Sequence, residues 1–297
     1  MTEFKFYPHA VVWEITFACN MRCIHCGTSA GKKRPNELTT DEALRLCDEL
    51  AELGTKWLTI SGGEPLLRPD WQQIARRAKA DGIDIGLISN GYAFDEAAAD
   101  AVADIGFRNV GLSFDGIEKT HNYIRQREDS FRRVTRAMDL MHQRGVKFCA
   151  VSQISNLNIN EMDQMWQILY DHHANGWQVQ LTTVTGRMKG VADMILSLDN
   201  YPRLIDKILE LRKRDGLNVR AGENIGYYGC KGSELWDELP YLGCYAGTRI
   251  LGIESDGTIK GCLSMPEDFV EGNIRDRSLT EIWNDPNTFS YNRNFTK

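Results

Sequence analysis

One local pattern recurs along most of the chain: a helical stretch, then a glycine, then a short strand rich in β-branched residues. Glycine just past the last helical turn takes the left-handed conformation that ends a helix. The glycines in question are Gly54, Gly82, Gly106, Gly145 and Gly176, with a weaker copy at Gly216. The strands after them are 57–60, 83–88, 110–114, 146–154, 177–184 and 217–220.

Strands that alternate with crossover helices form a parallel sheet, which right-handed crossovers curl into a barrel or an open arc. With an opening strand at 11–15, the chain holds six βα units, fewer than a closed eight-unit barrel needs. The predicted fold class is therefore α/β, a partial TIM barrel of (β/α)6 type. The pattern stops near residue 222. We expect two domains, 1–222 as the partial barrel and 223–297 as a smaller, glycine-rich unit.

Composition excludes several classes of function. With 297 residues, of which 42% are hydrophobic, the chain can bury a large core. A net charge of −6 argues against a nucleic-acid binder, which needs a basic face. No apolar signal segment opens the chain and no run is long enough to span a membrane, so we expect a cytoplasmic protein. Eight cysteines without an export signal favour metal ligation over disulfides.

Cys19, Cys23 and Cys26 follow the first predicted strand directly, with the spacing C-x3-C-x2-C. Chemistry in barrels of this kind sits at the carboxyl ends of strands, which is where these thiols fall. Three thiolates leave one iron of a four-iron cube without a protein ligand. The alternative is a structural zinc site completed by His25. A structural zinc ion is coordinated tetrahedrally by four protein ligands, usually from two separated pairs. His25 lies too close to the cysteines in the sequence to complete a tetrahedral site easily.

The second predicted strand ends in Ser61-Gly62-Gly63-Glu64-Pro65. Two glycines allow a ligand to approach bare backbone, and Glu64 offers a carboxylate at the rim. Alone, such a glycine pair is an ordinary loop.

Together, the cysteine spacing and the Gly62–Pro65 loop resemble the radical S-adenosylmethionine (radical SAM) superfamily. The resemblance implies that Cys19, Cys23 and Cys26 hold a [4Fe–4S] cluster, and that the glycine loop and Glu64 hold the amino group of SAM. It implies a radical SAM oxidoreductase or maturase, in which reductive cleavage of SAM yields a 5'-deoxyadenosyl radical that takes hydrogen from a substrate. A flavodoxin- or ferredoxin-like protein would supply the electron.

The resemblance also assigns cofactor contacts to the ends of later strands. Ser113 and Arg125 fit the ribose or carboxylate of SAM, with a surface role as the alternative. His25 occupies the position of an adenine-packing ring. Further polar candidates for the SAM pocket follow the strands in turn, and they are Ser61, Ser89, Asn90, Asp115, Ser152 and Asn156.

The C-terminal unit holds Cys230, Cys244 and Cys262. A hairpin with its turn at 255–257 would bring Cys244 and Cys262 to the same end. The spacing of Cys244, Gly257 and Cys262 resembles the SPASM/Twitch extensions, which hold auxiliary iron–sulfur clusters in peptide-modifying radical SAM enzymes. The later cysteine-rich run of that family would begin about where this chain ends. Either the extension is truncated, or Cys230 joins the other two around a cluster with an outside ligand. Reduced cysteines without metal are the alternative.

The extension implies a ribosomally made precursor peptide as substrate, matured by a thioether or carbon–carbon crosslink. Since the chain begins 18 residues before Cys19, we expect a separate leader-recognition protein to present the peptide. Other enzymes of similar architecture act on haem precursors or sulfatase side chains, and both stay open. Outside catalysis, the alternatives are an iron–sulfur electron carrier and a zinc-stabilised scaffold. An electron carrier has no use for an aminoacyl pocket, which argues against it.

Overall fold

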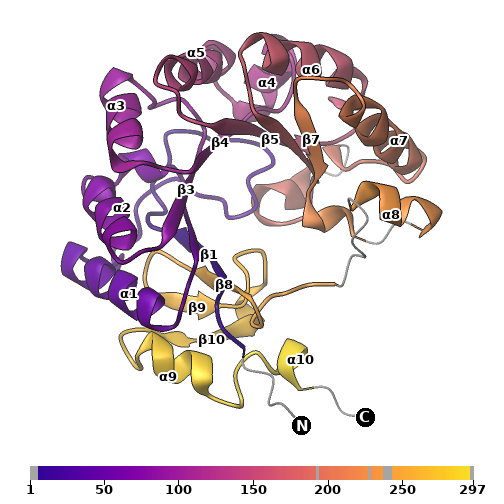
Figure 1. The fold of residues 1–297 in the computed structure, drawn as a ribbon. Coiled ribbons are helices and arrows are strands. Elements are labelled where there is room, and N and C mark those ends of the chain that lie inside the picture. Colours follow the sequence, from indigo (N-terminus) through magenta and orange to yellow (C-terminus); the bar gives the residue numbers. More distant parts are fainter. Residues whose placement is uncertain (1–5, 192–193, 227–228, 237–242, 295–297) are drawn as a thin grey trace.

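The computed structural model describes residues 6–191, 194–226, 229–236 and 243–294. Ten strands form one sheet in the order β10-β9-β8-β1-β2-β3-β4-β5-β6-β7. Figure 1 shows this sheet as an arc with the helices on its outer side. The arc is built from parallel strands: β1 (Ala10–Glu14), β2 (Trp57–Ser61), β3 (Asp84–Ser89), β4 (Asn109–Ser113), β5 (Phe148–Ile154), β6 (Gly176–Leu181) and β7 (Asn218–Ala221).

Crossover helices connect these strands, so the predicted α/β fold with six βα units is confirmed. The helices are α1 (Thr40–Glu52), α2 (Trp71–Ala80), α3 (Glu96–Ile105), α4 (Glu118–Arg125), α5 (Ser130–Gln143), α6 (Met162–Asp171) and α7 (Asn200–Arg212). Because β7 and β10 end the sheet on opposite sides, the barrel stays open. None of the described helices is both long and apolar enough to cross a membrane.

Glycine closes most of the helices as predicted. Gly106 caps α3 with φ +80°, and Gly54, Gly82 and Gly145 likewise have positive φ. The expectation fails at one unit. After α6 the left-handed residue is His173, with φ +60°, while Gly176 is already the first residue of β6. The chain therefore leaves this helix earlier than the glycine pattern predicts.

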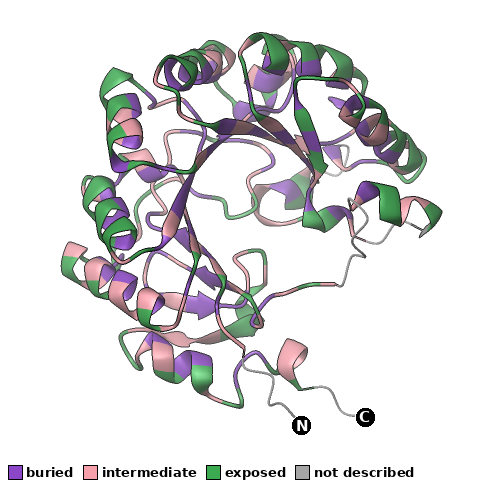
Figure 2. Ribbon diagram, in the orientation of Figure 1, coloured by how far each residue is buried: buried purple, intermediate pink, exposed green. Residues whose placement is uncertain are grey.

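Side chains alternate along each strand between the helices and the lumen, the inner side of the arc. In β5 the residues Phe148, Ala150, Ser152 and Ile154 are buried and their neighbours are half-buried. Its apolar members, Phe148, Ala150 and Ile154, pack with the inward faces of the helices in one hydrophobic cluster, visible as purple faces in Figure 2. This alternation decides which polar residues line the lumen and which support the core.

The C-terminal residues continue the barrel sheet. β8 (Ile250–Ile253) pairs with β1 in parallel, and β9 (Thr258–Lys260) returns antiparallel to β8. Gly257, with φ +88°, lies in the connecting turn, so the predicted hairpin is confirmed. The remaining elements are β10 (Val270–Asn273), α8 (Gly232–Leu235), α9 (Leu279–Asn284) and α10 (Ser290–Arg293). Sheet and core both run across the division predicted at residue 222, which stays a prediction.

Candidate active site

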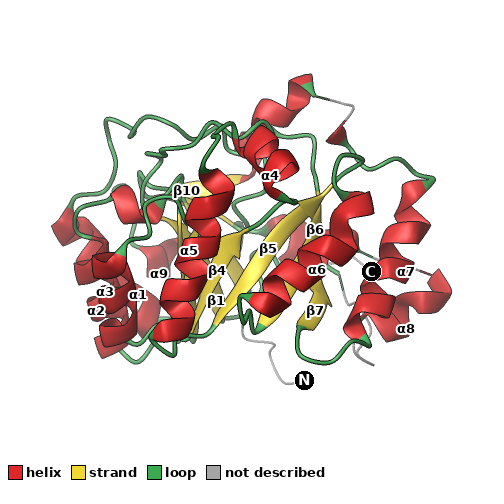
Figure 3. Ribbon diagram, turned by 90° about the horizontal axis from the view of Figure 1, so that it is seen from above, coloured by secondary structure: helices red, strands yellow, loops and turns green. Residues whose placement is uncertain are grey.

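The three clustered cysteines lie on a loop that leaves β1 and folds back on itself. The loop is closed at its base by two backbone hydrogen bonds, from Cys19 N to Gly31 O at 2.9 Å and from Gly31 N to Phe17 O at 3.0 Å. All three thiols are free; Cys23 is buried, and Cys19 and Cys26 are partly exposed. The loops that follow the parallel strands gather at this edge of the sheet (Figure 3). We call residues 17–31 the cysteine loop.

The Gly62–Gly63 pair packs against the backbone that leads into the cysteine loop. Gly63 N donates to Thr16 O and Glu64 N donates to Ala18 O, both at 2.8 Å. A Cβ on Gly62 would lie 2.5 Å from Thr16 O, and one on Gly63 would collide with the carbonyl of Ala18. The sequence suggested that these glycines leave room for a ligand. In the structure, the chain's own backbone occupies the space of the missing side chains, and the pair fixes where the cysteine loop begins. The contact of Gly62 and Gly63 with a ligand stays a prediction.

Glu64 joins the ends of β2 and β3. Its carboxylate is fully buried and accepts from Ser89 Oγ at 2.9 Å and from Asn90 N at 2.8 Å. Burial raises the pKa of Glu64 to about 7, against the lowering effect of these hydrogen bonds. Asn90 Nδ2 donates to Asn20 Oδ1 at 2.8 Å and lies 3.9 Å from Cys19 Sγ. The fold thus brings these predicted residues together beside the first cysteine.

A buried charged group lies beside Cys23. Asp115 Oδ2 is 3.1 Å from His25 Nε2 and 2.5 Å from Arg125 Nη2. Burial alone would raise the pKa of Asp115, but the Arg125 guanidinium holds it well below its usual range. Nη1 of the same guanidinium is 3.7 Å from Cys23 Sγ. His121 Nδ1 accepts a hydrogen bond from Asp115 N at 3.2 Å. Burial lowers the pKa of His121 to about 3, so its imidazole is neutral.

The residues present fit an iron–sulfur cluster and a polar ligand. Burial raises the pKa of Cys19 to about 11 and also raises that of Cys23, so both stay thiols until a cation such as iron compensates the charge. Within the described part of the chain, His25 Nδ1 and Arg125 Nε are buried without a hydrogen-bond partner. A ligand carboxylate would satisfy the Arg125 donor, as an unpaired buried donor is costly.

Among the residues that the structure describes, no three His, Cys, Asp or Glu side chains are arranged around a single metal ion. In a four-iron cube each thiolate binds its own iron, so its ligands spread further apart than those of one zinc ion.

Two of the predicted SAM-pocket residues, Ser152 and Asn156, form hydrogen bonds within the protein. Ser152 faces the helices, where its Oγ donates to Phe114 O and accepts from Trp177 Nε1 at 2.7 Å. Asn156 Nδ2 donates to Ile195 O at 2.8 Å, and its Oδ1 accepts from two further donors. On β5 the lumen-facing neighbour of Ser152 is Gln153, whose Oε1 is buried without a partner among the described residues. Strand alternation was the signal that could have selected it.

The other predicted residues are spread over this edge. Ser61 and Ser113 are half-buried at the ends of β2 and β4, on the lumen side, and Pro65 is buried as the first residue of a 3-10 turn. Sequence reasoning missed Glu37, whose carboxylate accepts from Thr16 Oγ1 at 3.0 Å, from Phe17 N at 2.7 Å and from Arg34 N at 3.1 Å. It holds the start of the cysteine loop to the segment that follows the loop, and no local pattern marks it.

The C-terminal cysteines lie at the open end of the β8–β9 hairpin. Cys262 follows β9 and is half-buried, and Cys244 precedes β8 and is exposed. Because the two strands are antiparallel, both residues belong to the same end, as predicted. The backbone there is held by Asn292 Nδ2, which donates to Cys244 O at 3.1 Å. Cys230 is exposed in a separate 3-10 turn next to α8.

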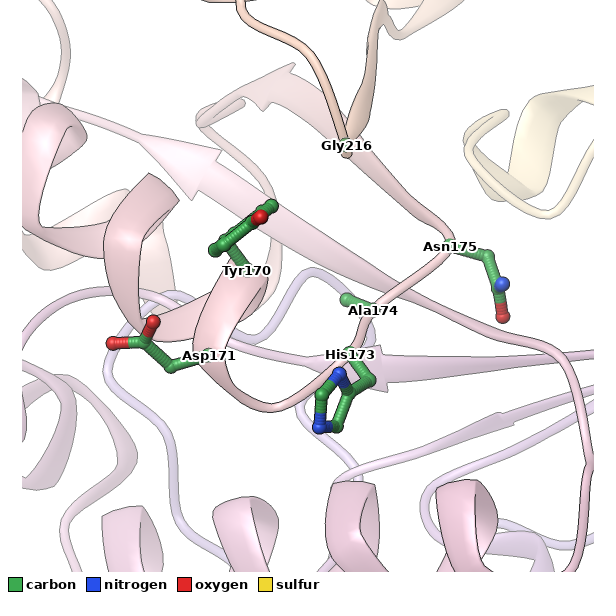
Figure 4. Close-up of a pocket in the computed structure, with 6 residues that line it drawn as sticks. All are labelled: Tyr170, Asp171, His173, Ala174, Asn175 and Gly216. Atoms are coloured by element: carbon green, nitrogen blue, oxygen red, sulfur yellow. The ribbon is translucent and has the colours of Figure 1, made fainter.

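A surface pocket at the opposite edge of the barrel is unrelated to these groups. Tyr170, Asp171, His173, Ala174, Asn175 and Gly216 line it (Figure 4). Asn175 precedes β6 and Gly216 precedes β7, so the pocket lies at the amino ends of the strands, away from the cysteine loop.

Family models match two parts of the chain. A model described as the radical SAM superfamily matches residues 13–171, more than half of the chain and including the cysteine loop. A second, SPASM, described as an iron–sulfur cluster-binding domain, matches residues 244–297. That range includes Cys244 and Cys262 and excludes Cys230.

The chain is similar to a heme synthase and to a mycofactocin maturase. The AdoMet-dependent heme synthase of Methanosarcina barkeri is 28% identical over 296 residues, which cover 95% of this chain and 84% of that protein. The mycofactocin maturase MftC of Mycobacterium tuberculosis is 26% identical over 287 residues, which cover 95% of this chain and 72% of that protein.

Two solved structures share the fold. Streptococcus suis SuiB bound to precursor peptide SuiA has a TM-score of 0.80 at 14% identity, covering 99% of this chain and 68% of that one. Native anSMEcpe with bound AdoMet has a TM-score of 0.73 at 19% identity, covering 93% and 80%. The family match, which spans more than half of the chain, decides the identity: the protein belongs to the radical SAM superfamily, as an enzyme with a [4Fe–4S] cluster and S-adenosylmethionine as cofactors and a C-terminal SPASM domain.

Proposed function

We propose that Cys19, Cys23 and Cys26 hold the catalytic cluster and that the enzyme modifies a precursor peptide in the lumen of the open barrel. When bound, the reduced cluster and SAM supply a 5'-deoxyadenosyl radical that abstracts a hydrogen atom. The chain's own residues bind and orient these groups. Arg125 Nε, a buried donor without a partner among the described residues, is the group we assign to the SAM carboxylate.

His25 is held in place for the adenine by its 3.1 Å contact with Asp115. Glu64, Ser89 and Asn90 fix the loops on which the aminoacyl end of SAM would rest. Ser61, Ser113 and Gln153 face the lumen beside them, so a substrate entering there meets hydroxyl and amide groups.

The lumen supports a peptide substrate by its chemistry. Strands β1 to β6 contain no lysine or arginine, and β7 has one, Arg220, next to Gln178 in the sheet register. Most half-buried polar side chains on their lumen side are neutral groups that both donate and accept hydrogen bonds, namely Thr59, Ser61, Asn109, Ser113, Gln153, Gln178 and Gln180. Asp84, at the amino end of β3, is the charged exception. The neutral groups match peptide amides, whereas the carboxylates of a haem precursor would favour arginine or lysine. This composition is the observation that carries the proposal.

Similarity adds support for a peptide partner. The SuiB structure that shares this fold contains a precursor peptide, and MftC is named as a maturase of mycofactocin. The heme synthase relative keeps a haem precursor as the second candidate substrate, since its identity to this chain is of the same order. The flavodoxin- or ferredoxin-like reductant and the separate leader-recognition protein stay predictions.

For the SPASM domain we propose an auxiliary cluster on Cys244 and Cys262. The hairpin geometry and the family match both support these two residues. Cys230, outside the matched range, stays a prediction as third ligand. We keep the division into residues 1–222 and 223–297 as a proposal about function, with the catalytic cluster in the first part and the auxiliary cluster in the second.

The test is SAM cleavage followed by a choice of substrate. Anaerobically reconstituted protein with dithionite and SAM is expected to release 5'-deoxyadenosine, and Cys23→Ala to release none. The peptide encoded beside the gene and an iron-containing haem precursor are then supplied in parallel and analysed by mass spectrometry. A mass change in the peptide alone supports the proposal; a change in the haem precursor alone would overturn the peptide assignment.

A further inference from the structure

The segment after β6 reaches across the barrel to the cysteine loop. Arg187 Nε donates to Cys23 O at 2.8 Å, Arg187 Nη1 donates to Ala30 O at 3.0 Å, and Arg187 N donates to Cys26 O at 3.0 Å. One residue thus binds the backbone of two proposed cluster ligands and the far arm of the loop, although 164 positions separate it from Cys23.

Close packing reinforces these hydrogen bonds. Gly186 has φ +53°, and a Cβ there would collide with the carbonyl oxygens of Cys26 and Gly27. A Cβ on Gly27 would in turn lie 3.1 Å from Thr185 Oγ1. The two backbones therefore touch, and the contact leaves no space for a side chain on Gly186.

An apolar cluster packs next to the same contact. Met188 is fully buried with Ile124 and Met194, and Ile24 of the cysteine loop packs against them. Ile24 N also donates to Ile124 O at 3.0 Å. The cysteine loop is thus wedged between the segment after β6 and the end of α4.

A loop of this kind needs support from outside itself. Residues 20–30 form no helix or strand, so most of their carbonyls have no partner in regular structure. A guanidinium presents several donors in a rigid plane and can bind two carbonyls at once, which an ammonium cannot do in the same geometry.

We propose that Arg187 is a positioning residue for the catalytic cluster: its guanidinium holds the carbonyls of Cys23 and Ala30 so that the three thiols keep the spacing a four-iron cube needs. The proposal rests on the ligand set assigned above. Without Arg187 the cluster still forms, because the thiols remain, but the loop opens more often and the cluster is lost faster.

The test compares Arg187→Ala and Arg187→Lys with wild type, using Lys189→Ala as a matched control. Lys189 is exposed two residues away on the same turn. Each protein is reconstituted anaerobically, its thermal melting is checked, and the release of iron to a chelator is followed with time. Losing two hydrogen bonds predicts about tenfold faster release for both Arg187 variants. Lysine keeps the positive charge but lacks the planar guanidinium that binds two carbonyls at once. A wild-type rate of iron release in Arg187→Lys would therefore overturn the bidentate role.

A second variant addresses the same contact without changing the arginine. Gly186→Ala is expected to accelerate iron release as well, and to broaden the EPR signal of the reduced cluster because the loop must shift. Release at the wild-type rate in all three variants would overturn the proposal.

In the triple variant Cys19→Ala, Cys23→Ala and Cys26→Ala, any iron that remains is bound outside the proposed catalytic cluster. This amount of iron is subtracted from the iron measured in each of the other proteins. If the wild type binds no more iron than this triple variant, the proposed ligand set fails, and the failure is distinct from that of the Arg187 proposal.

Discussion

Arg125 Nη1 lies 3.7 Å from Cys23 Sγ, while Nη2 of the same guanidinium binds the buried carboxylate of Asp115 at 2.5 Å. A positive and a negative charge therefore sit together beside a proposed cluster ligand, and both are almost wholly removed from water. Each should act on the reduction potential of the cluster, with opposite sign.

The first prediction concerns that potential. Arg125→Gln removes a positive charge and should lower the midpoint potential, whereas Asp115→Asn removes a negative charge and should raise it. A unit charge at this range contributes on the order of 1 kcal/mol or more, which corresponds to roughly 40 mV or more for a one-electron couple. EPR-monitored redox titration without SAM measures both. Shifts of the same sign in the two variants would contradict the electrostatic account. The double variant should return close to wild type.

The second prediction concerns SAM binding. Glu64→Ala removes the carboxylate predicted to hold the amino group of SAM and also leaves Asn90 N and Ser89 Oγ without their acceptor. Loss of a hydrogen bond to a charged group should weaken the binding of SAM roughly ten- to a hundred-fold. Isothermal calorimetry on the cluster-loaded, unreduced protein gives the dissociation constant. Ser89→Ala, which removes only one of the donors to Glu64, should have a smaller effect. A dissociation constant unchanged in Glu64→Ala would reject a role for this carboxylate in the SAM pocket.

The third prediction is a dependence of stability on pH. Arg275 binds both carboxylate oxygens of Glu42 on α1, at 2.7 and 2.9 Å, and lowers the pKa of Glu42 to about 2. A carboxyl whose pKa is lower in the folded state stabilises the fold above its unfolded pKa of about 4.3 and loses that effect as pH falls towards 2. Glu42→Gln should therefore destabilise the protein at pH 7, by about 1 kcal/mol or less for a partly exposed pair.

Thermal unfolding at several pH values checks this prediction. The difference between Glu42→Gln and wild type should shrink between pH 4.5 and pH 2. Glu52→Gln, at an exposed position of the same helix, is the control and should show no such trend. A difference that is constant over this range of pH would mean that Glu42 acts by packing and not by charge.

The fourth prediction is that the SPASM domain holds iron independently of the cysteine loop. The triple alanine variant of Cys19, Cys23 and Cys26 should retain up to roughly four irons per chain after reconstitution, with a cube-type EPR signal on reduction. Adding Cys262→Ala should remove that signal. A folded triple variant free of iron would show that Cys244 and Cys262 hold no cluster in this chain.

The sequence alone determined the fold class and the chemistry, because both depend on patterns among residues that are close together in the chain. Glycine after a helical turn and alternation along strands are preferences of a few neighbouring residues, and they predicted six βα units. The spacing of Cys19, Cys23 and Cys26 is likewise local, and it was enough to indicate the radical SAM superfamily. Since that superfamily is enzymatic, the alternatives of an electron carrier and a zinc-stabilised scaffold fall away.

Tertiary structure decided how the site is held together. Three contacts join segments that are far apart in the chain. β8 pairs with β1, Gly62 and Gly63 pack on the backbone that follows β1, and Arg187 binds the carbonyl of Cys23. Such contacts follow from strand register and from which face of a strand a side chain occupies. A shift by one residue exchanges the two faces, which is why Ser152 is committed to the core while Gln153 lines the lumen.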